Sequence, residues 1–459
     1  MRKDGAFGMR TMFDEWKIYS MMTACGPPSY FYAPERRFAS LRPPAPLNGG
    51  HEEKKTSSRR TPNKSAGKRY VAYRFRGKPD EEQSRLLSSF CGSTRWIWNR
   101  WVSDYREGKP FLRPAQIKKE DGHDWLRDVD AQALCNAQLD FERAMSEHAK
   151  GEKGSPRFHK KHERADSYTT NRISGSENVD LRGNFLKLPK IEKPIRLIPH
   201  RKIEEGGILK SATVTREPDG RWYFSLLFEY GAKPDAEFSD ALEKFFETGD
   251  AEGLSRVGLD MSLPDFFVAS DGSLPEYELA GGTVKFEKQF RKYEKRIARE
   301  QRKLSHMKKD SANYSERLRK IARLHAKAKH ARRDFQNQLA VRLARKYDVV
   351  SIEDLDVSAM KKALKFGKSV SDLGWGRFVG ILERKLEAEG HILIRVSRWF
   401  PSSKTCRSCG FVHKELRLSD RTFVCPKCGN AVGRDEQAAM NINGEGLRIL
   451  NEIRIKKTA

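Results

Sequence analysis

Between residues 69 and 231 the spacing of apolar positions changes twice. Residues 70–76 (Tyr-Val-Ala-Tyr-Arg-Phe-Arg) alternate in polarity, which is typical of a strand with one basic face. Residues 80–106 carry apolar side chains at helical spacing, and helical, polar sequence continues to about residue 150. Short alternating segments, separated by Pro and Gly, return between 180 and 230. We therefore predict a small β-barrel over 69–231, interrupted by a helical insertion at about 79–150.

A second pattern follows a polar, acidic segment at 232–256, which we interpret as a linker with one short helix. Two short apolar runs each end at a carboxylate, Val257–Leu259 at Asp260 and Tyr347–Ile352 at Glu353. Between them, residues 284–346 form a highly basic helical stretch, predicted as a hairpin with its turn near Ser311–Asn313. A predicted helix at 374–389 leads into a strand at 391–396. This order of elements predicts an α/β domain with a mixed sheet over residues 257–400.

Residues 1–68 are rich in Pro, Gly, Ser and Arg, and predict a disordered basic extension. Over the whole chain, 89 Lys and Arg residues stand against 62 Asp and Glu residues, a net charge of +27. This charge favours a polyanionic partner, most simply nucleic acid, over a membrane surface. No apolar run approaches the ~20 residues of a membrane-spanning helix, and the N-terminus does not resemble a signal peptide. We expect a soluble, intracellular protein that does not bind membranes, in a reducing compartment such as the cytoplasm.

Four of the seven cysteines form two Cys-x-x-Cys knuckles, Cys406 with Cys409 and Cys425 with Cys428, separated by 15 residues. Each knuckle can fill two corners of a tetrahedral zinc site, and the glycine after each pair allows the tight turn. The alternative is four unligated core thiols, which this spacing disfavours. We predict a zinc ribbon over 401–432, followed by a last helix and tail at 433–459. A site closed by four cysteines performs no chemistry itself.

Three carboxylates can come together in this topology. Asp260 and Glu353 end strands, and Asp435 opens the last helix. A two-metal site for phosphodiester hydrolysis holds two Mg²⁺ ions about 3.5–4 Å apart, and carboxylates from several elements of the fold bind these ions. Each acid taken alone could instead be only a strand-end or helix-start residue, and Asp435 could simply favour a helix N-terminus. Together, in a chain this basic, they favour a two-metal nuclease site.

Several basic and polar residues are candidates for nucleic-acid binding. Those near the first strand and helix are Arg74, Arg76, Arg95 and Asn99, and Lys404 precedes the first knuckle. The tryptophans in the same helix favour a core role. The hairpin at 284–346 could be a solvated helix face, but its excess of Lys and Arg over acids favours a phosphate-facing surface.

Four segments of the sequence resemble one known family. They are Val257-Gly258-Leu259-Asp260-Met261-Ser262, Ser351-Ile352-Glu353-Asp354-Leu355, Trp399-Phe400-Pro401-Ser402-Ser403-Lys404-Thr405-Cys406, and Arg434-Asp435 through Asn441-Ile442. In order, type and spacing they are similar to TnpB (OrfB) proteins of bacterial insertion sequences, relatives of the compact type V CRISPR effectors. The resemblance covers about residues 69–445. It implies a RuvC-like, RNase H-type nuclease domain with an inserted zinc ribbon. It also implies an N-terminal β-barrel that carries a helical recognition lobe.

The resemblance further implies an RNA-guided DNA endonuclease encoded by a transposable element. Asp260, Glu353 and Asp435 would bind two Mg²⁺ ions, and the partners would be a guide RNA and double-stranded target DNA. The protein would act as a monomer or homodimer in a bacterial or archaeal cytoplasm, associated with the nucleoid. Gln437, where an asparagine is usual, and Pro264, close after the first acid, depart from the family pattern without removing a metal ligand. Two other functions stay open: a guide-directed DNA-binding regulator that does not cleave, and a transposase that catalyses strand transfer.

Overall fold

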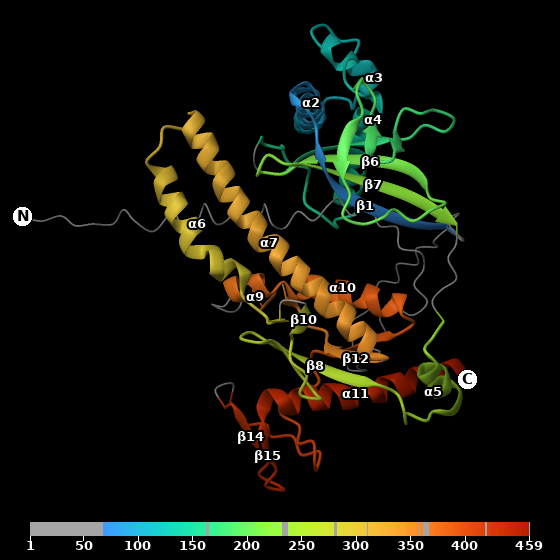
Figure 1. Ribbon diagram of the computed structural model, residues 1–459, viewed down its shortest axis with the longest axis vertical. Coiled ribbons are helices and arrows are strands. Elements are labelled where there is room, and N and C mark those ends of the chain that lie inside the picture. Colours follow the sequence, from blue (N-terminus) through green and yellow to red (C-terminus); the bar gives the residue numbers. More distant parts are fainter. Residues whose placement is uncertain are drawn as a thin grey trace, which may run out of the picture. The chain divides into compact units, whose positions relative to one another are not determined.

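The computed structural model describes residues 68–161, 165–231, 237–279, 282–309, 311–357, 359–360, 367–417 and 420–458. The described chain divides into two compact units (Figure 1). The first contains residues 68–231 together with 315–323, and the second contains the remainder. The disordered extension predicted at 1–68 lies outside the described residues, apart from Lys68.

The first unit is built on a seven-stranded antiparallel sheet with the strand order β2-β6-β7-β1-β5-β4-β3. The strands are β1 (Lys68–Lys78), β2 (Asp166–Asn171), β3 (Asp180–Arg182), β4 (Phe185–Lys187), β5 (Ile195–Ile198), β6 (Ile208–Arg216) and β7 (Trp222–Gly231). The edge strands β2 and β3 do not pair with each other among the described residues. The sheet is therefore open between these two edges, whereas the sequence predicted a small β-barrel.

Helices pack on this sheet as the helical spacing predicted. They are α2 (Glu81–Arg106), α3 (Pro114–Ile117), the 3-10 turn η1 (Asp124–Arg127) and α4 (Ala131–Ala149). Asp80 caps the N-terminus of α2: its side chain accepts a hydrogen bond from the Gln83 N–H, and the Gln83 side chain accepts one from the Asp80 N–H. Trp101, 1% exposed, lies in the core shared by sheet and helices, as predicted for the tryptophans.

The second unit contains a four-stranded mixed sheet with the order β13-β12-β8-β9. The strands are β8 (Arg256–Ser262), β9 (Phe266–Ala269), β12 (Val349–Glu353) and β13 (Ile392–Val396). Strands β8, β12 and β13 run parallel, and only β9 is antiparallel to its neighbour. This arrangement confirms the predicted mixed α/β fold. A small hairpin, β10 (Tyr277–Leu279) with β11 (Gly282–Val284), follows β9.

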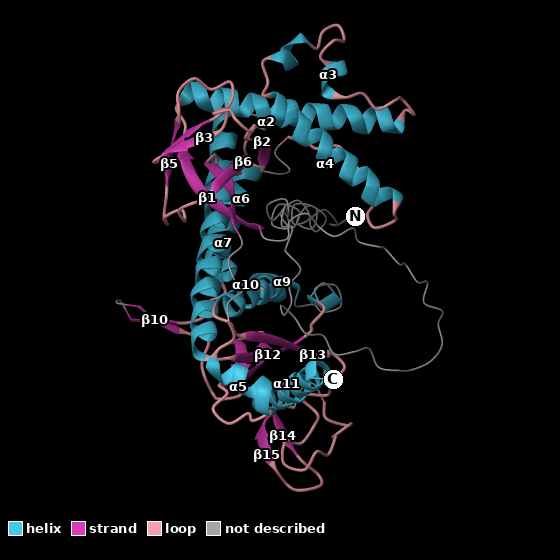
Figure 2. Cartoon of the chain, turned by 90° about the vertical axis from the view of Figure 1, so that its right-hand side faces the viewer, coloured by secondary structure: helices cyan, strands magenta, loops and turns pink. Residues whose placement is uncertain are grey.

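Helices cover both faces of this sheet (Figure 2). The helices of this part of the chain include α5 (Asp240–Thr248), α6 (Gln289–Ser305), α7 (Ala312–Lys346), α9 (Gly367–Leu373), α10 (Trp375–Ala388) and α11 (Arg434–Thr458). Of these, α6 contributes no described residue to the two cores beside the sheet. Because side chains along a strand alternate between faces, Leu259 and Ile352 join the core with α7 and α10. Val349 and Ile394 lie in the opposite core with α5 and α11. Helix α5 lies in the segment expected to be a linker, yet Leu242 and Phe245 of this helix are fully buried in that core.

Candidate functional site

Asp260 and Glu353 lie side by side on the neighbouring parallel strands β8 and β12. The last registered pair of these strands is Leu259 with Ile352, and each acid follows it directly. On the same face of the sheet, Gly258 and Ser351 contact helix α11. Since residues two apart on a strand share a face, both acids lie on the face that α11 covers. The sequence prediction that strand ends bring these two acids together agrees with this register.

Helix α11 reaches the strands because two glycines permit close approach. A Cβ added to Gly258 would lie 2.2 Å from the Ala439 carbonyl oxygen, and one added to Gly446 would lie 1.9 Å from Ser351 Oγ. These contacts hold α11, whose first turn carries Asp435, against the sheet (Figure 1). The Asp435 side chain is 41% exposed and lies 3.8 Å from the Arg421 guanidinium.

The three acids influence one another electrostatically. Burial, together with the negative charges of Glu353 and Asp435, raises the pKa of the Asp260 carboxyl well above its usual range. The positive charge of Arg434 acts in the opposite direction. Burial also raises the pKa of Glu353, and a hydrogen bond from Ser402 opposes that rise. A bound cation would relieve this repulsion and favour the ionised carboxylates.

The oxygens of these acids do not form a compact cluster in this structure. Within the described ranges, only the four cysteines bring three or more potential metal-ligating atoms within 4.8 Å of one another. The donor set of three carboxylates on adjacent elements suits Mg²⁺, which keeps several water ligands and needs few protein oxygens. The three acids therefore suit a Mg²⁺ site in which water supplies several ligands. Their oxygens are less tightly grouped than the cysteine sulfurs.

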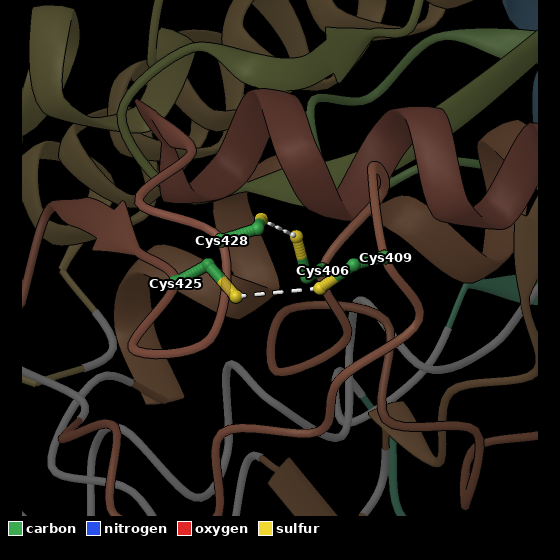
Figure 3. A group of neighbouring side chains, drawn as sticks. All are labelled: Cys406, Cys409, Cys425 and Cys428. Carbon is green, nitrogen blue, oxygen red and sulfur yellow. Dashed lines mark hydrogen bonds between the residues drawn. The ribbon is translucent and has the colours of Figure 1, made fainter.

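The four cysteines converge as predicted (Figure 3). The Sγ atoms of Cys406 and Cys428 lie 3.7 Å apart, and those of Cys409 and Cys425 lie 3.6 Å apart. A tetrahedral site with Zn–S bonds of ~2.3 Å requires sulfur separations of about 3.8 Å. The cluster thus has the geometry of one structural Zn²⁺. It lies beside the hairpin of β14 (Thr422–Val424) and β15 (Ala431–Gly433), and Phe423 fills its small core.

Cys406 and Cys428 differ in how readily their thiols ionise. Burial opposes ionisation of Cys406, but hydrogen bonds from the backbone N–H groups of Cys409 and Ser408 outweigh it and lower its pKa to about 6. The Asn430 N–H favours the Cys428 thiolate, yet the neighbouring sulfurs raise the Cys428 pKa to about 12. Four adjacent thiolates repel one another without a cation, so a zinc ion would take the place of the remaining protons.

Ser402 is a residue to which the sequence analysis gave no role. Its Oγ donates a hydrogen bond to Glu353 Oε1 at 2.5 Å, across 49 positions of sequence. Asn441 and Gln437 of α11 donate to backbone carbonyls of the same loop. Gln437, the departure from the family pattern, therefore contacts the loop before the zinc site. The Pro-Ser-Ser-Lys segment in the sequence could have drawn attention to Ser402. It does not indicate which carboxylate would accept the hydrogen bond from the Ser402 hydroxyl.

The predicted nucleic-acid contacts have different surroundings. Arg74 pairs with Glu217 at 2.6 Å and lies over the Tyr223 ring, and Arg95 pairs with Asp166 at 2.5 Å. Both polar ends of the Asn99 amide bond the backbone of His159. These three contacts stabilise the unit itself.

Arg76 and Lys404 complete the set of predicted contacts. Arg76 is exposed on β1 and forms no ion pair with another described residue. Lys404 Nζ donates to the Lys414 carbonyl at 3.0 Å. In the described part of the chain, no helix is long and apolar enough to cross a membrane.

Family models match three segments of the chain. Residues 237–364 match an OrfB model of the IS605 type described as "Probable transposase". Residues 375–442 match "Cas12f1-like, TNB domain", which includes the four-cysteine cluster. Residues 69–108 match a model described as "Helix-turn-helix domain", although this segment forms strand β1 and the single helix α2 here.

Two relatives align with this chain over most of its length and most of their own. A Streptomyces pristinaespiralis protein named "Putative RNA-guided DNA endonuclease" is 30% identical over 396 residues, 82% of this chain and 89% of the relative. The Escherichia coli K12 protein InsQ, with the same description, is 27% identical over 409 residues, 83% of this chain and 94% of the relative. A solved Cas12f1–sgRNA–target DNA complex aligns with a TM-score of 0.47 and 14% identity, covering 79% of this chain and 83% of that one. By its sequence identity and coverage, the chain belongs to the TnpB (OrfB) family of IS605-type insertion-sequence proteins.

Proposed function

We propose that this protein is an RNA-guided DNA endonuclease that hydrolyses target DNA at a site formed by Asp260, Glu353 and Asp435. The observation that carries the proposal is the placement of the acids: two on adjacent parallel strands and one at the head of the helix that covers them. Relatives named as RNA-guided DNA endonucleases support the guided activity. The net charge of +27 suits a chain that binds two nucleic acids.

The three acids would hold two Mg²⁺ ions. When bound, such ions activate a water molecule and stabilise the leaving 3′ oxygen of the phosphodiester. Asp260 would be one of the residues that hold the ions, since it is close enough to respond to the charges of both other acids. Glu353 would offer the oxygen that does not accept the Ser402 hydrogen bond, and Asp435, whose side chain is 41% exposed, would be the third ligand.

The order β9-β8-β12-β13, with acids on β8 and β12, supports a RuvC-like, RNase H-type fold for the second unit. In this proposal the zinc ribbon is structural and fixes the loop that leads from β13 to α11. The first unit would provide the barrel-like module and helical recognition lobe that bind the guide RNA. Its basic residue Arg76 and the basic helices α6 and α7 would contact phosphate groups.

The decisive experiment is cleavage by the protein purified with its native RNA. The copurifying RNA is sequenced, and a plasmid that matches its guide segment is incubated with the complex in Mg²⁺. We expect double-strand cleavage by wild type and none by Asp260→Ala, Glu353→Gln or Asp435→Asn, with target binding retained. Asp265→Asn, an exposed acid in the turn after β8, is the matched control and should cleave.

One observation favours a second candidate, a guide-directed DNA-binding protein that does not cleave. Among the described residues, the three carboxylates are not gathered as tightly as the cysteines. Specific binding of the matched plasmid by wild type, without cleavage in Mg²⁺ or Mn²⁺, would support that function. A covalent protein–DNA adduct would instead indicate strand transfer, because metal-assisted hydrolysis forms no such intermediate.

A further inference from the structure

The carboxylate of Glu353 receives a hydrogen bond from the loop that leads into the zinc ribbon. Ser402 Oγ donates to Glu353 Oε1 at 2.5 Å, and Ser402 is only 5% exposed. A hydrogen bond to a charged group in a buried setting is stronger than a neutral one, and it fixes the orientation of its acceptor. One Glu353 oxygen is thereby held toward Ser402, and the other is left for a different partner.

The Ser402 loop is in turn held by two buried amides of α11. Asn441 Nδ2 donates to the carbonyl oxygens of Ser402 and Thr405, both at 2.7 Å. Gln437 Nε2 donates to the same Thr405 carbonyl at 2.8 Å. Asn441 is 5% exposed and Gln437 is fully buried. Breaking such bonds would leave buried polar groups unsatisfied, so the loop has one strongly preferred position.

The zinc ribbon fixes the other end of this loop. Cys406 follows Thr405 directly, and its N–H donates to the Phe411 carbonyl at 2.8 Å within the first knuckle. Helix α11, which supplies Gln437 and Asn441, also carries Asp435 in its first turn. The ribbon, the loop and two of the three acids are therefore joined by a continuous set of hydrogen bonds.

We propose that Ser402 is a positioning residue for metal binding: its hydroxyl orients Glu353 toward a divalent ion, and Asn441 and Gln437 hold that hydroxyl in place. This role rests on the proposed nuclease function. Groups that orient a metal ligand typically change metal affinity or activity by about 10–100-fold when removed. The role also gives the ribbon a task beyond its own stability, because zinc would fix the loop on which Ser402 lies.

The test uses Ser402→Ala, Ser402→Thr, which keeps a hydroxyl, and Ser403→Ala as the matched control in the same loop. Metal binding is measured on RNA-free protein by the loss of the free Mn²⁺ signal in electron paramagnetic resonance. The Asp260→Ala variant measures how much Mn²⁺ binds outside the proposed site. In parallel, the Mg²⁺ concentration for half-maximal cleavage is measured on the RNA complex. Zinc content and the unfolding midpoint establish that each variant is folded.

We expect Ser402→Ala to weaken Mn²⁺ binding and to raise the half-maximal Mg²⁺ concentration by about tenfold, with one zinc retained. Ser402→Thr should recover most of both values, and Ser403→Ala should match wild type. Asn441→Ala should shift metal binding in the same direction as Ser402→Ala. A purely structural role for Ser402 would change the unfolding midpoint and leave metal affinity unchanged.

Failure of this role and failure of the nuclease function give different results. If wild type cleaves and Ser402→Ala binds and uses metal as wild type does, the positioning role is overturned and the nuclease function stands. If wild type does not cleave, yet Ser402→Ala still weakens Mn²⁺ binding at the Asp260-dependent site, the positioning role stands without the nuclease function.

Discussion

Gly258 of β8 lies directly against Ala439 of α11, so that an added Cβ would come within 2.2 Å of the Ala439 carbonyl oxygen. Backbone atoms cannot rotate away from such a contact, and the strand or the helix would have to move. We therefore expect Gly258→Ala to lower the free energy of unfolding by about 1–3 kcal/mol, as overpacking typically does. Urea denaturation measures this change.

The control for Gly258 is Gly380→Ala in helix α10. An added Cβ there meets nothing closer than Arg384 Nη1 at 3.8 Å, and alanine favours a helix over glycine by about 1 kcal/mol. This variant should be as stable as wild type or more so. If both substitutions change the stability alike, α11 does not pack as tightly against Gly258 in solution as this contact implies.

Removal of zinc should unfold the ribbon selectively. Structural zinc contributes about 10–16 kcal/mol of apparent free energy in small zinc peptides, and the ribbon has only a small core around Phe423. We expect a strong chelator, or Cys406→Ser, to make residues near 401–433 sensitive to protease. Cys135→Ser, an exposed cysteine outside the cluster, should retain zinc and protease resistance. Unchanged resistance after chelation would show that the sulfurs hold no structural metal.

The sequence predicted the mixed sheet and both strand-borne acids because buried parallel strands are short apolar runs whose ends are visible. Asp260 and Glu353 follow such runs directly, and parallel pairing brings them to the same level. The knuckles were predictable for a similar reason, since each Cys-x-x-Cys pair is local. Strand β2 was missed because Tyr168 is its one buried apolar residue in an otherwise polar run.

Other features depend on contacts that no local pattern records. Whether the sheet of the first unit closes depends on its edge strands β2 and β3, not on alternation within any strand. The hairpin turn lies slightly earlier than predicted, because Ser311 Oγ accepts a hydrogen bond from the Tyr314 N–H and α7 begins at Ala312. The Ser402–Glu353 bond joins side chains from different elements, so it required coordinates.

Substitutions of Arg76 and Arg95 should have different effects, the first on nucleic-acid binding and the second on stability. Arg76 is exposed without an ion-pair partner among the described residues, whereas Arg95 is held by Asp166 at 2.5 Å. We expect Arg76→Ala to weaken RNA binding and to reduce the slope of log affinity against log salt by up to about 1. Fluorescence anisotropy with the copurifying RNA between about 50 and 200 mM salt measures both effects.

Arg95→Ala is the comparison for Arg76→Ala. Loss of its partly exposed ion pair should lower stability by no more than about 1 kcal/mol and leave the salt slope unchanged. The assignment of Arg76 to phosphate contact is wrong if its removal leaves the salt slope at the wild-type value.

His325 of α7 should make the stability of the second unit depend on pH. Its ring stacks on Phe290 of α6, with centroids 5.8 Å apart, and burial lowers its pKa from 6.5 to about 4. Below pH 6.5 the unfolded chain binds a proton that the folded chain does not. This contribution to stability is therefore complete above pH 6.5 and is lost progressively between pH 6.5 and 4, by on the order of 3 kcal/mol. His325→Phe should keep the stacked ring and remove this loss.

Urea unfolding of wild type and His325→Phe at pH 7.5, 6 and 5 measures the difference, which should grow in favour of the variant as the pH falls. His306→Asn is the control, because His306 is exposed at the end of α6 in the same hairpin. This variant controls for the loss of a histidine from the hairpin. A His325→Phe difference that stays constant with pH would mean that water reaches the ring of His325 in solution.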